Sequence, residues 1–161
     1  MDHLLDINEA YHKLSVRADM LYEFVMMYHN YIYNRHSYEK EQFNMLEIHI
    51  LSYIDDSPGV TSTELAKIWH KSKSAISQVI KKLIDREYIE KRYKDGNEKS
   101  AFLYVTERGR HISSIHKAYD VADITQTTAY LIEQCSAEDL DAFYRILGKY
   151  NELLKSELEQ G

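Results

Sequence analysis

One stretch, residues 61–106, constrains the fold of this chain more than any other. Thr61 is followed three positions later by Glu64, and this spacing lets the two residues cap the start of a short helix reciprocally. A break in the apolar pattern separates this helix from a second, longer one. Apolar and polar residues then alternate at 89–93 and at 101–105, as they do in strands with one buried face. The stretch therefore predicts a short helix, a turn, a longer helix and a two-stranded hairpin.

The longer predicted helix is amphipathic, and Ser72 can cap its first turn. Apolar residues recur at helical spacing on one face, and these are Ala75, Ile76, Val79, Ile80, Leu83 and Ile84. Hydroxyls, an amide and lysines occupy the other face, at Lys73, Ser74, Ser77, Gln78, Lys81 and Lys82. Such side chains suit phosphates and base edges, although many charged helix faces are merely solvated. A helix-turn-helix followed by a hairpin is a winged helix-turn-helix, whose second helix enters the DNA major groove.

The tip of the predicted hairpin is basic and contains turn-forming residues. Asp95, Gly96 and Asn97 supply the turn chemistry, and Lys94 and Lys99 lie on either side of them. In a winged helix this hairpin is the wing, and a plain surface hairpin is the alternative. We therefore predict DNA contacts at Ser72, Lys73, Ser74, Ser77, Gln78, Lys81, Lys82, Lys94, Asn97 and Lys99.

The same stretch resembles the MarR family of bacterial winged-helix regulators. The matching segments are Glu64-Leu65-Ala66, residues 72–83, Ile89-Glu90-Lys91-Arg92 and, most specifically, Leu103-Tyr104-Val105-Thr106-Glu107-Arg108-Gly109-Arg110. The resemblance implies a fold that is mainly α with a small β-hairpin wing, in which long N- and C-terminal helices form a dimer. The chain departs from the family pattern at Glu87, where glycine is usual, and at Asn97 and Lys99, where the wing usually carries Asp-x-Arg.

Charge is distributed unevenly along the chain. The net charge is −6, but residues 65–99 contain ten Lys or Arg and five Asp or Glu, so this segment is +5 and the remainder −11. A basic segment inside an acidic chain is typical of a regulator that touches DNA with one face. We expect a salt-dependent affinity that rests on relatively few phosphate contacts.

Long helices are predicted before the winged module. In residues 4–34, apolar positions recur every three or four residues, which makes a heptad seam that needs a partner helix. We expect that partner largely in a second subunit, with packing inside the same chain as the alternative. A further helix is expected from about Glu39 to Ile54, and Pro58, the single proline, follows it. Val60 is expected to form a short strand beside the wing.

Two more helices with apolar seams are expected after Thr106, and Ser136 can cap the last one together with Asp139. Seams on terminal helices without a core of their own favour an intertwined homodimer, which would read a pseudo-palindromic site. The predicted organisation is an N-terminal dimerisation helix (1–38), a winged module (39–110) and C-terminal dimerisation helices (111–161), together forming one intertwined domain.

The resemblance also implies a ligand pocket where the first, second and fifth helices meet the winged module. Its expected walls are aromatic or flexible side chains that suit a small aromatic or amphipathic effector, at Tyr22, Met26, Tyr31, Tyr53 and Tyr119. Plain core packing is the alternative role for these residues.

A metal site is a second possibility for the sensor. Some relatives in the family sense zinc with ligands on the second and fifth helices, and His49, His116 and Asp120 fall near those positions. His116 and Asp120 are one helical turn apart and could hold one ion. Ordinary core or solvated histidines are the alternative, and no other cofactor is expected.

Other protein classes are disfavoured. The sequence has no Gly-rich phosphate loop and no nucleophile motif, so an enzyme is not expected. No apolar run approaches the ~18 residues of a membrane span, and the N-terminus does not resemble a signal peptide. The single cysteine, Cys135, fits a cytoplasmic protein and would be a redox switch only as an exposed thiolate. We expect a cytoplasmic, dimeric, DNA-binding transcriptional regulator, a repressor released by a ligand or signal. A winged-helix protein-interaction module without DNA binding is the alternative.

Overall fold

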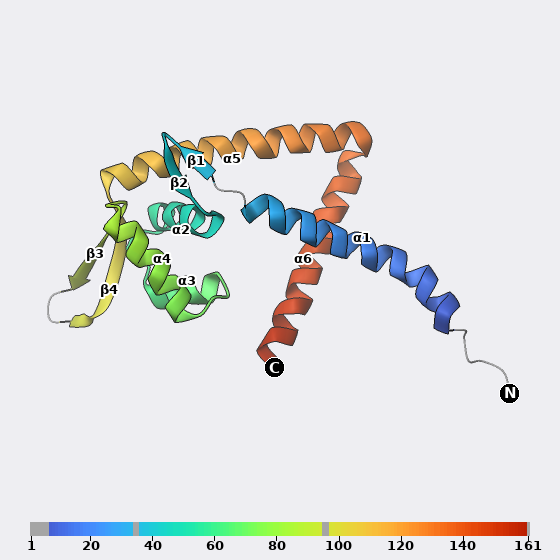
Figure 1. Ribbon diagram of the computed structural model, residues 1–161, viewed down its shortest axis with the longest axis horizontal. Coiled ribbons are helices and arrows are strands. Elements are labelled where there is room, and N and C mark those ends of the chain that lie inside the picture. The colour runs from blue at the N-terminus through green and yellow to red at the C-terminus, as the bar shows by residue number, and fades with distance from the viewer. Residues whose placement is uncertain (1–6, 34–35, 95–96, 161) are drawn as a thin grey trace. The chain divides into compact units, whose positions relative to one another are not determined.

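The computed structural model describes residues 7–33, 36–94 and 97–160, with side chains except at 32–33, 36, 94, 97–100 and 158–160. In chain order the elements are α1 (Ile7–Tyr33), β1 (His36–Tyr38), β2 (Glu41–Phe43), α2 (Met45–Asp56), α3 (Ser62–Ile68), α4 (Lys73–Asp85), β3 (Ile89–Lys94), β4 (Asn97–Val105), α5 (Glu107–Gln134) and α6 (Ala137–Gln160) (Figure 1). The chain divides into a first unit that ends at His116 and a second that begins at Lys117. The predicted fold class, mainly α with a small hairpin wing, is confirmed.

A short antiparallel hairpin, β1–β2, precedes α2 (Figure 1). Tyr38 pairs with Glu41 across its two-residue turn. The turn residues Glu39 and Lys40 have φ angles of 48° and 73°, which is the left-handed backbone that matches the twist of the flanking strands. Neither residue is Gly or Asn, so the sequence carries no conventional signal for this turn.

The start of α2 corrects the sequence prediction. Asn44 accepts a hydrogen bond from the backbone N–H of Glu47 at 2.9 Å, and Glu47 Oε2 accepts one from the N–H of Asn44 at 3.1 Å. This capping box fixes Met45 as the first helical residue. The expected start at Glu39 is therefore wrong, because the preceding residues form the hairpin.

The hydrophobic core of the first unit lies between α2, α3, α4 and the wing sheet. Its fully buried members include Phe43, Ile48, Leu51, Ile54, Leu65, Ile76, Leu83, Tyr88 and Leu103. The amphipathic stripe predicted for α4 is confirmed, since Ile76, Val79, Ile80 and Leu83 are buried while the opposite face is exposed. Burial of one face leaves the other face of α4 available to a partner.

The wing is formed by β3 and β4, which pair antiparallel from Ile89↔Val105 onwards. Val60 forms an isolated bridge to Leu103, as expected beside the wing. At the base of the wing, Gly109 allows α5 to approach β3 closely, because a Cβ there would lie 1.9 Å from the carbonyl oxygen of Tyr88. The close approach ties the first turn of α5 to the wing.

The end of α4 is a complete Schellman motif. The N–H of Tyr88 donates to the carbonyl of Leu83 at 2.9 Å, and the N–H of Glu87 donates to that of Ile84 at 2.8 Å. Glu87 occupies the left-handed position of the motif with φ 61°. The helix end is thus formed as tightly as a glycine would allow, and Glu87 bears the conformational strain.

Apolar side chains on α1 are exposed. The seam residues are 75% exposed at Ile7, 69% at Leu14 and 52% at Val25.

In the second unit, α6 begins with the predicted capping box, in which Asp139 N–H donates to Ser136 Oγ at 3.1 Å. Its seam is also exposed, with Phe143, Tyr150 and Leu154 each about half accessible. None of the described helices has the length and apolar character needed to cross a bilayer.

Candidate nucleic-acid interface

The exposed face of α4 presents the side chains that the sequence predicts for DNA contact. Ser72 caps the helix by accepting a hydrogen bond from the N–H of Ala75 at 3.2 Å, and its Oγ lies 3.0 Å from that of Ser74. Exposed positions along one face are Lys73, Ser74, Ser77, Gln78, Lys81 and Lys82. The structure therefore brings together all the predicted α4 residues on one polar surface.

The two neighbouring lysines of this face have different partners. Lys81 Nζ lies 2.6 Å from Asp85 on the same helix, and both side chains are largely exposed. Lys82 Nζ lies 3.0 Å from Oε1 of Glu47, whose side chain is only 7% exposed. An exposed pair opens at little cost, so Lys81 is available to a phosphate, whereas Lys82 is held against α2.

Beyond Lys82, the end of α4 is anchored by Arg86. Its guanidinium donates to Glu41 Oε2 at 2.8 Å and to the carbonyl of Gln42 at 3.0 Å. It also lies over the rings of Phe43 and Tyr88, 4.3 Å and 5.0 Å from their centroids. Bidentate donation and stacking together suit arginine and not lysine. The hairpin β1–β2 thus holds the end of the predicted recognition helix.

Glu41 also joins α4 to α5, because Arg108 donates to its second carboxylate oxygen. Hydrogen bonds from Arg86, and then from Tyr88 and Arg108, hold the pKa of Glu41 below its usual value. Burial raises the pKa of the Tyr88 phenol. Sequence reasoning missed this cluster because it expected a helix, with no hairpin, around Glu41.

The predicted wing contacts cannot be placed in the same way. The side chains of Lys94, Asn97 and Lys99 lie outside the described part of the chain. Near the base of the wing, Arg92 lies 2.6 Å from Glu90 and over the ring of Tyr104 at 4.3 Å. The three wing contacts stay predictions.

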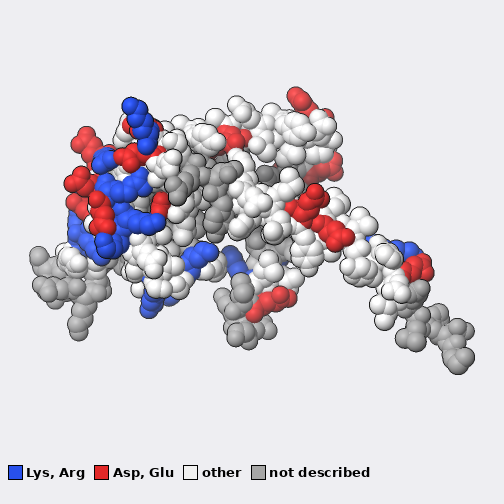
Figure 2. All heavy atoms as spheres, viewed as in Figure 1, with Lys and Arg blue, Asp and Glu red and all other residues white. Residues whose placement is uncertain are grey.

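Basic side chains on the visible face gather over the winged module, interspersed with acidic ones (Figure 2). The mixture reflects pairs such as Arg86 with Glu41 and Lys82 with Glu47. Lys73, at the start of α4, has no ion-pair partner among the described residues. The charge of Lys73 therefore remains available at the N-terminus of α4, next to the Ser72 cap.

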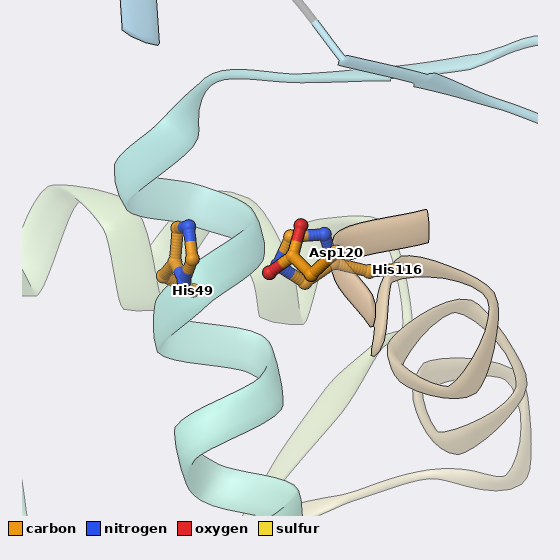
Figure 3. A group of neighbouring side chains, drawn as sticks. All are labelled: His49, His116 and Asp120. Atoms are coloured by element: carbon orange, nitrogen blue, oxygen red, sulfur yellow. The ribbon is translucent and has the colours of Figure 1, made fainter. Parts of the chain in front are cut away.

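His49, His116 and Asp120, which the sequence suggests as metal ligands, lie close together (Figure 3). The rings of His49 on α2 and His116 on α5 are 4.8 Å apart and nearly perpendicular. Asp120 follows His116 by one turn of the same helix, and one donor atom from each of the three lies within 4.8 Å of the others. Nδ1 of the buried His116 lies 2.8 Å from the hydroxyl of Tyr38, so the hairpin also orients this ring.

The residues predicted to wall an effector pocket do not border the main cavity of the first unit. Tyr22, Met26 and Tyr31 on α1 and Tyr119 on α5 are each about half exposed or more. Tyr53 borders a smaller hollow of about 360 Å³. The larger cavity, of about 930 Å³, is lined by His29 of α1, by residues of β2, α2 and the C-terminal part of α4, and by the turn between α3 and α4. The pocket residues stay a prediction.

Comparison with known proteins finds structures of the same fold and a family match within the winged module. Residues 42–98 match the sequence profile of the MarR family. An uncharacterized HTH-type transcriptional regulator of Bacillus subtilis, YvnA, is 29% identical over 118 residues, which is 71% of this chain and 74% of the relative. The HTH-type transcriptional regulator PchR of Bacillus subtilis is 24% identical over 73% of this chain and 69% of its own length.

Two solved structures share the fold over almost their whole length. Streptococcus pneumoniae FabT in complex with DNA has a TM-score of 0.68 and 18% identity, covering 91% of this chain and 98% of that one. Lactococcus lactis ZitR, a zinc-responsive MarR family member, has a TM-score of 0.68 and 17% identity, covering 88% and 99%. The winged helix-turn-helix module of this chain therefore shares the fold of these structures, and it contains the residues, 42–98, that match the MarR family profile.

Proposed function

We propose that this protein is a sequence-specific DNA-binding transcriptional regulator, a cytoplasmic homodimer and not an enzyme. The observation that carries the proposal is the two-sided character of α4. One face of this helix is buried in the core, and the other exposes hydroxyl, amide and ammonium groups. Ser74, Ser77 and Gln78 would read base edges in a major groove. Lys73 and Lys81 would contact phosphates, which position the helix without reading sequence.

The exposed apolar seams support a dimer. Leucine, isoleucine and aromatic side chains recur along α1 and α6, and many of them, such as Ile7, Leu14, Tyr144 and Ile146, are more than half exposed in the single chain. A second copy would bury these faces and place two α4 helices against one pseudo-palindromic site. Occupancy of a promoter by such a dimer would block polymerase, so repression relieved by a ligand or signal is the expected mode.

Selection of duplexes from a randomised pool at two salt concentrations tests this function. We expect an inverted repeat with half-sites about one helical turn apart. Gln78→Ala should relax the preference at one position of each half-site, at a cost of roughly 1–3 kcal/mol per lost base contact. Failure to enrich any sequence would contradict the proposal and favour a protein-interaction module.

Lys81→Ala provides the matched electrostatic test. It should weaken binding to all duplexes and lower the slope of log affinity against log salt by about one. Lys13→Ala is the control, because Lys13 is equally exposed and also pairs with an acid one turn away, Glu9, but on α1. Equal salt slopes for the two variants would show that α4 does not lie on the DNA.

A zinc-responsive regulator is the second candidate, favoured by the grouping of His49, His116 and Asp120. Two imidazoles and a carboxylate form a typical zinc donor set, with bonds of about 2.0–2.2 Å. Their donor atoms lie within 4.8 Å of one another, so the side chains would have to move closer together to form such bonds. Because Tyr38 engages Nδ1 of His116, Nε2 would be the coordinating atom, oriented by a partner in the way that metal-binding histidines usually are.

Titration with Co²⁺ as a spectroscopic substitute for zinc tests this site without reference to DNA. We expect ligand-field absorption bands that Zn²⁺ displaces and that His49→Gln abolishes. His12→Gln, which changes an exposed histidine on α1, should leave the spectrum unchanged. Bands of the same intensity in the His49 variant would eliminate this site.

A further inference from the structure

The end of α4 is joined directly to the first turn of α5, although the whole wing lies between them in the sequence. Thr106 Oγ1 donates a hydrogen bond to the carbonyl of Glu87, just beyond α4, at 2.7 Å. The same oxygen accepts a hydrogen bond from the N–H of Gly109 at 3.0 Å and so caps α5. One hydroxyl group therefore serves the end of one helix and the start of the other.

Arg108 adds to this junction from the first turn of α5. Its Nη1 donates to the backbone carbonyl of Arg86, the C-cap of α4, at 3.3 Å. A cation at the carbonyl end of a helix also interacts favourably with the helix dipole. The guanidinium donates to Glu41 as well, and it lies over the ring of Tyr88, 4.8 Å from the centroid. Arg108 thus contacts the end of α4, the start of the wing and the hairpin β1–β2 at once.

The chemistry of Arg108 suits the control of geometry more than the control of stability. Its side chain is 49% exposed, so solvent screens its charge and its contribution to the free energy of unfolding is modest. A guanidinium nevertheless presents its donors in a rigid, planar fork. One arginine can therefore hold a carbonyl of α4 and a carboxylate of the hairpin in a fixed direction.

The position of α5 gives this junction a consequence for DNA binding. From the junction, α5 continues to Gln134 and so enters the segment, residues 111–161, that we expect in the subunit contact. In a dimer held by these helices, a movement of α4 relative to α5 changes the distance between the two copies of α4. That distance has to match half-sites about one helical turn apart. The stiffness of the junction therefore determines how strictly the dimer measures this spacing.

We propose that Arg108 is a positioning residue that sets the half-site spacing accepted by the dimer, because it fixes α4 to α5. It lies outside the predicted set of DNA-contacting residues and reads no base itself. The inference rests on the proposed function and deepens it, since it names a residue that controls one part of the specificity. Loss of Arg108 broadens the range of accepted spacings and leaves the preferred bases of each half-site unchanged.

The test uses the intact protein and the inverted repeat obtained by selection, with one or two base pairs added to or removed from its centre. Wild type should bind the selected spacing best and lose affinity with each change. Arg108→Gln should lower the ratio of affinities between the selected spacing and a spacing one base pair longer by about threefold or more, as variants of coupling residues do. Base preference within the half-site should be the same as in wild type, which loss of folded structure alone would not produce.

Arg92→Gln is the matched control. Arg92 also pairs with an acid and stacks on a tyrosine, but both contacts stay within the wing, so the spacing ratio should remain that of wild type. Arg108→Lys keeps the charge and loses the fork, and it should give an intermediate ratio. This variant carries the test if circular dichroism shows that Arg108→Gln is unfolded. Ratios in both Arg108 variants equal to that of wild type overturn the proposal, as does an equal reduction in Arg92→Gln.

Hydrogen exchange tests the junction without DNA. Arg108→Gln should speed exchange in peptides from the end of α4 and from the start of α5 together, whereas Arg92→Gln should not. Unchanged exchange in both peptides overturns the junction, whether or not the protein binds DNA. Failure of wild type to bind any duplex contradicts the proposed function and the spacing role together. DNA binding by wild type, with spacing ratios that the Arg108 variants leave unchanged, overturns the spacing role alone.

Discussion

Lys82 Nζ lies 3.0 Å from Oε1 of Glu47, so a lysine of the predicted DNA-reading face is tied to a buried carboxylate on α2. Glu47 is also the residue that closes the capping box of α2 with Asn44. The pair therefore links the polar face of α4 to the first turn of α2. We conclude that Lys82 positions the recognition helix in the free protein.

Lys82→Met should lower the free energy of unfolding by about 1–3 kcal/mol, because it leaves a buried carboxylate with one hydrogen bond fewer. Lys81→Met is the control. Its partner Asp85 is exposed, so the change should stay within about 0.5 kcal/mol. Urea denaturation of both variants measures the difference. Equal stabilities would mean that water replaces Lys82 at Glu47 without cost.

Glu87→Gly should stabilise the protein. Glu87 has φ 61° at the left-handed position of the Schellman motif, where a residue with a Cβ is strained and glycine is not. We expect a gain of about 0.5–1 kcal/mol in the free energy of unfolding, reduced by the greater chain entropy of glycine when unfolded. Glu87→Ala keeps the Cβ and removes the charge, and thermal unfolding should show no such gain. A gain of the same size in Glu87→Ala would assign the effect to charge.

The stability of the first unit should decrease as the pH falls below about 4.5, the ordinary pKa of a glutamate. Hydrogen bonds from Arg86, Tyr88 and Arg108 lower the pKa of Glu41 in the folded state. A group whose pKa is lower when folded contributes stability above its unfolded pKa, and that contribution is lost as the pH falls through the folded value. Glu41→Gln removes this contribution.

Urea denaturation between pH 3 and 7 checks this dependence. The loss of stability on acidification should be smaller in Glu41→Gln than in wild type. The comparison variant is Glu39→Gln, which changes the neighbouring hairpin acid that pairs with His111 at the surface. An identical pH dependence in wild type and Glu41→Gln would show that the bonds from Arg86 and Arg108 are equally strong to a neutral acid.

Local patterns were sufficient to predict much of the winged module. The two helix caps, at Thr61 and Ser72, and the apolar stripe of α4 depend on residues that are close together in the sequence. Such features can be predicted from residue spacing alone. The polar face of α4 follows from the same periodicity. Its exposure in the structure agrees with the predicted DNA-contacting residues, whose contact with DNA stays a prediction.

Non-local contacts could not be predicted in this way. The ion pair between Glu41 and Arg86 joins residues that are 45 positions apart, so no local pattern indicates it. The hairpin turn between β1 and β2 was missed because Glu39 and Lys40 occupy the positions where Asn or Gly would usually signal such a turn. The cavity beside α4 is similarly built from several separate segments.

Leu14→Glu combined with Val25→Glu should convert the protein to a monomer. Both residues lie on the heptad seam of α1 and are more than half exposed in the single chain, so neither change disturbs the core of the winged module. Two charges on each copy would enter the apolar contact between subunits, where unpaired charges are costly. Sedimentation velocity should show the loss of the dimer, and DNA binding should fall sharply because two half-sites are no longer bound together.

Lys13→Glu combined with Asp19→Lys alters exposed α1 residues off the seam and should leave the dimer intact. A dimer that survives the seam variant would place the subunit contact elsewhere, on α5 or α6.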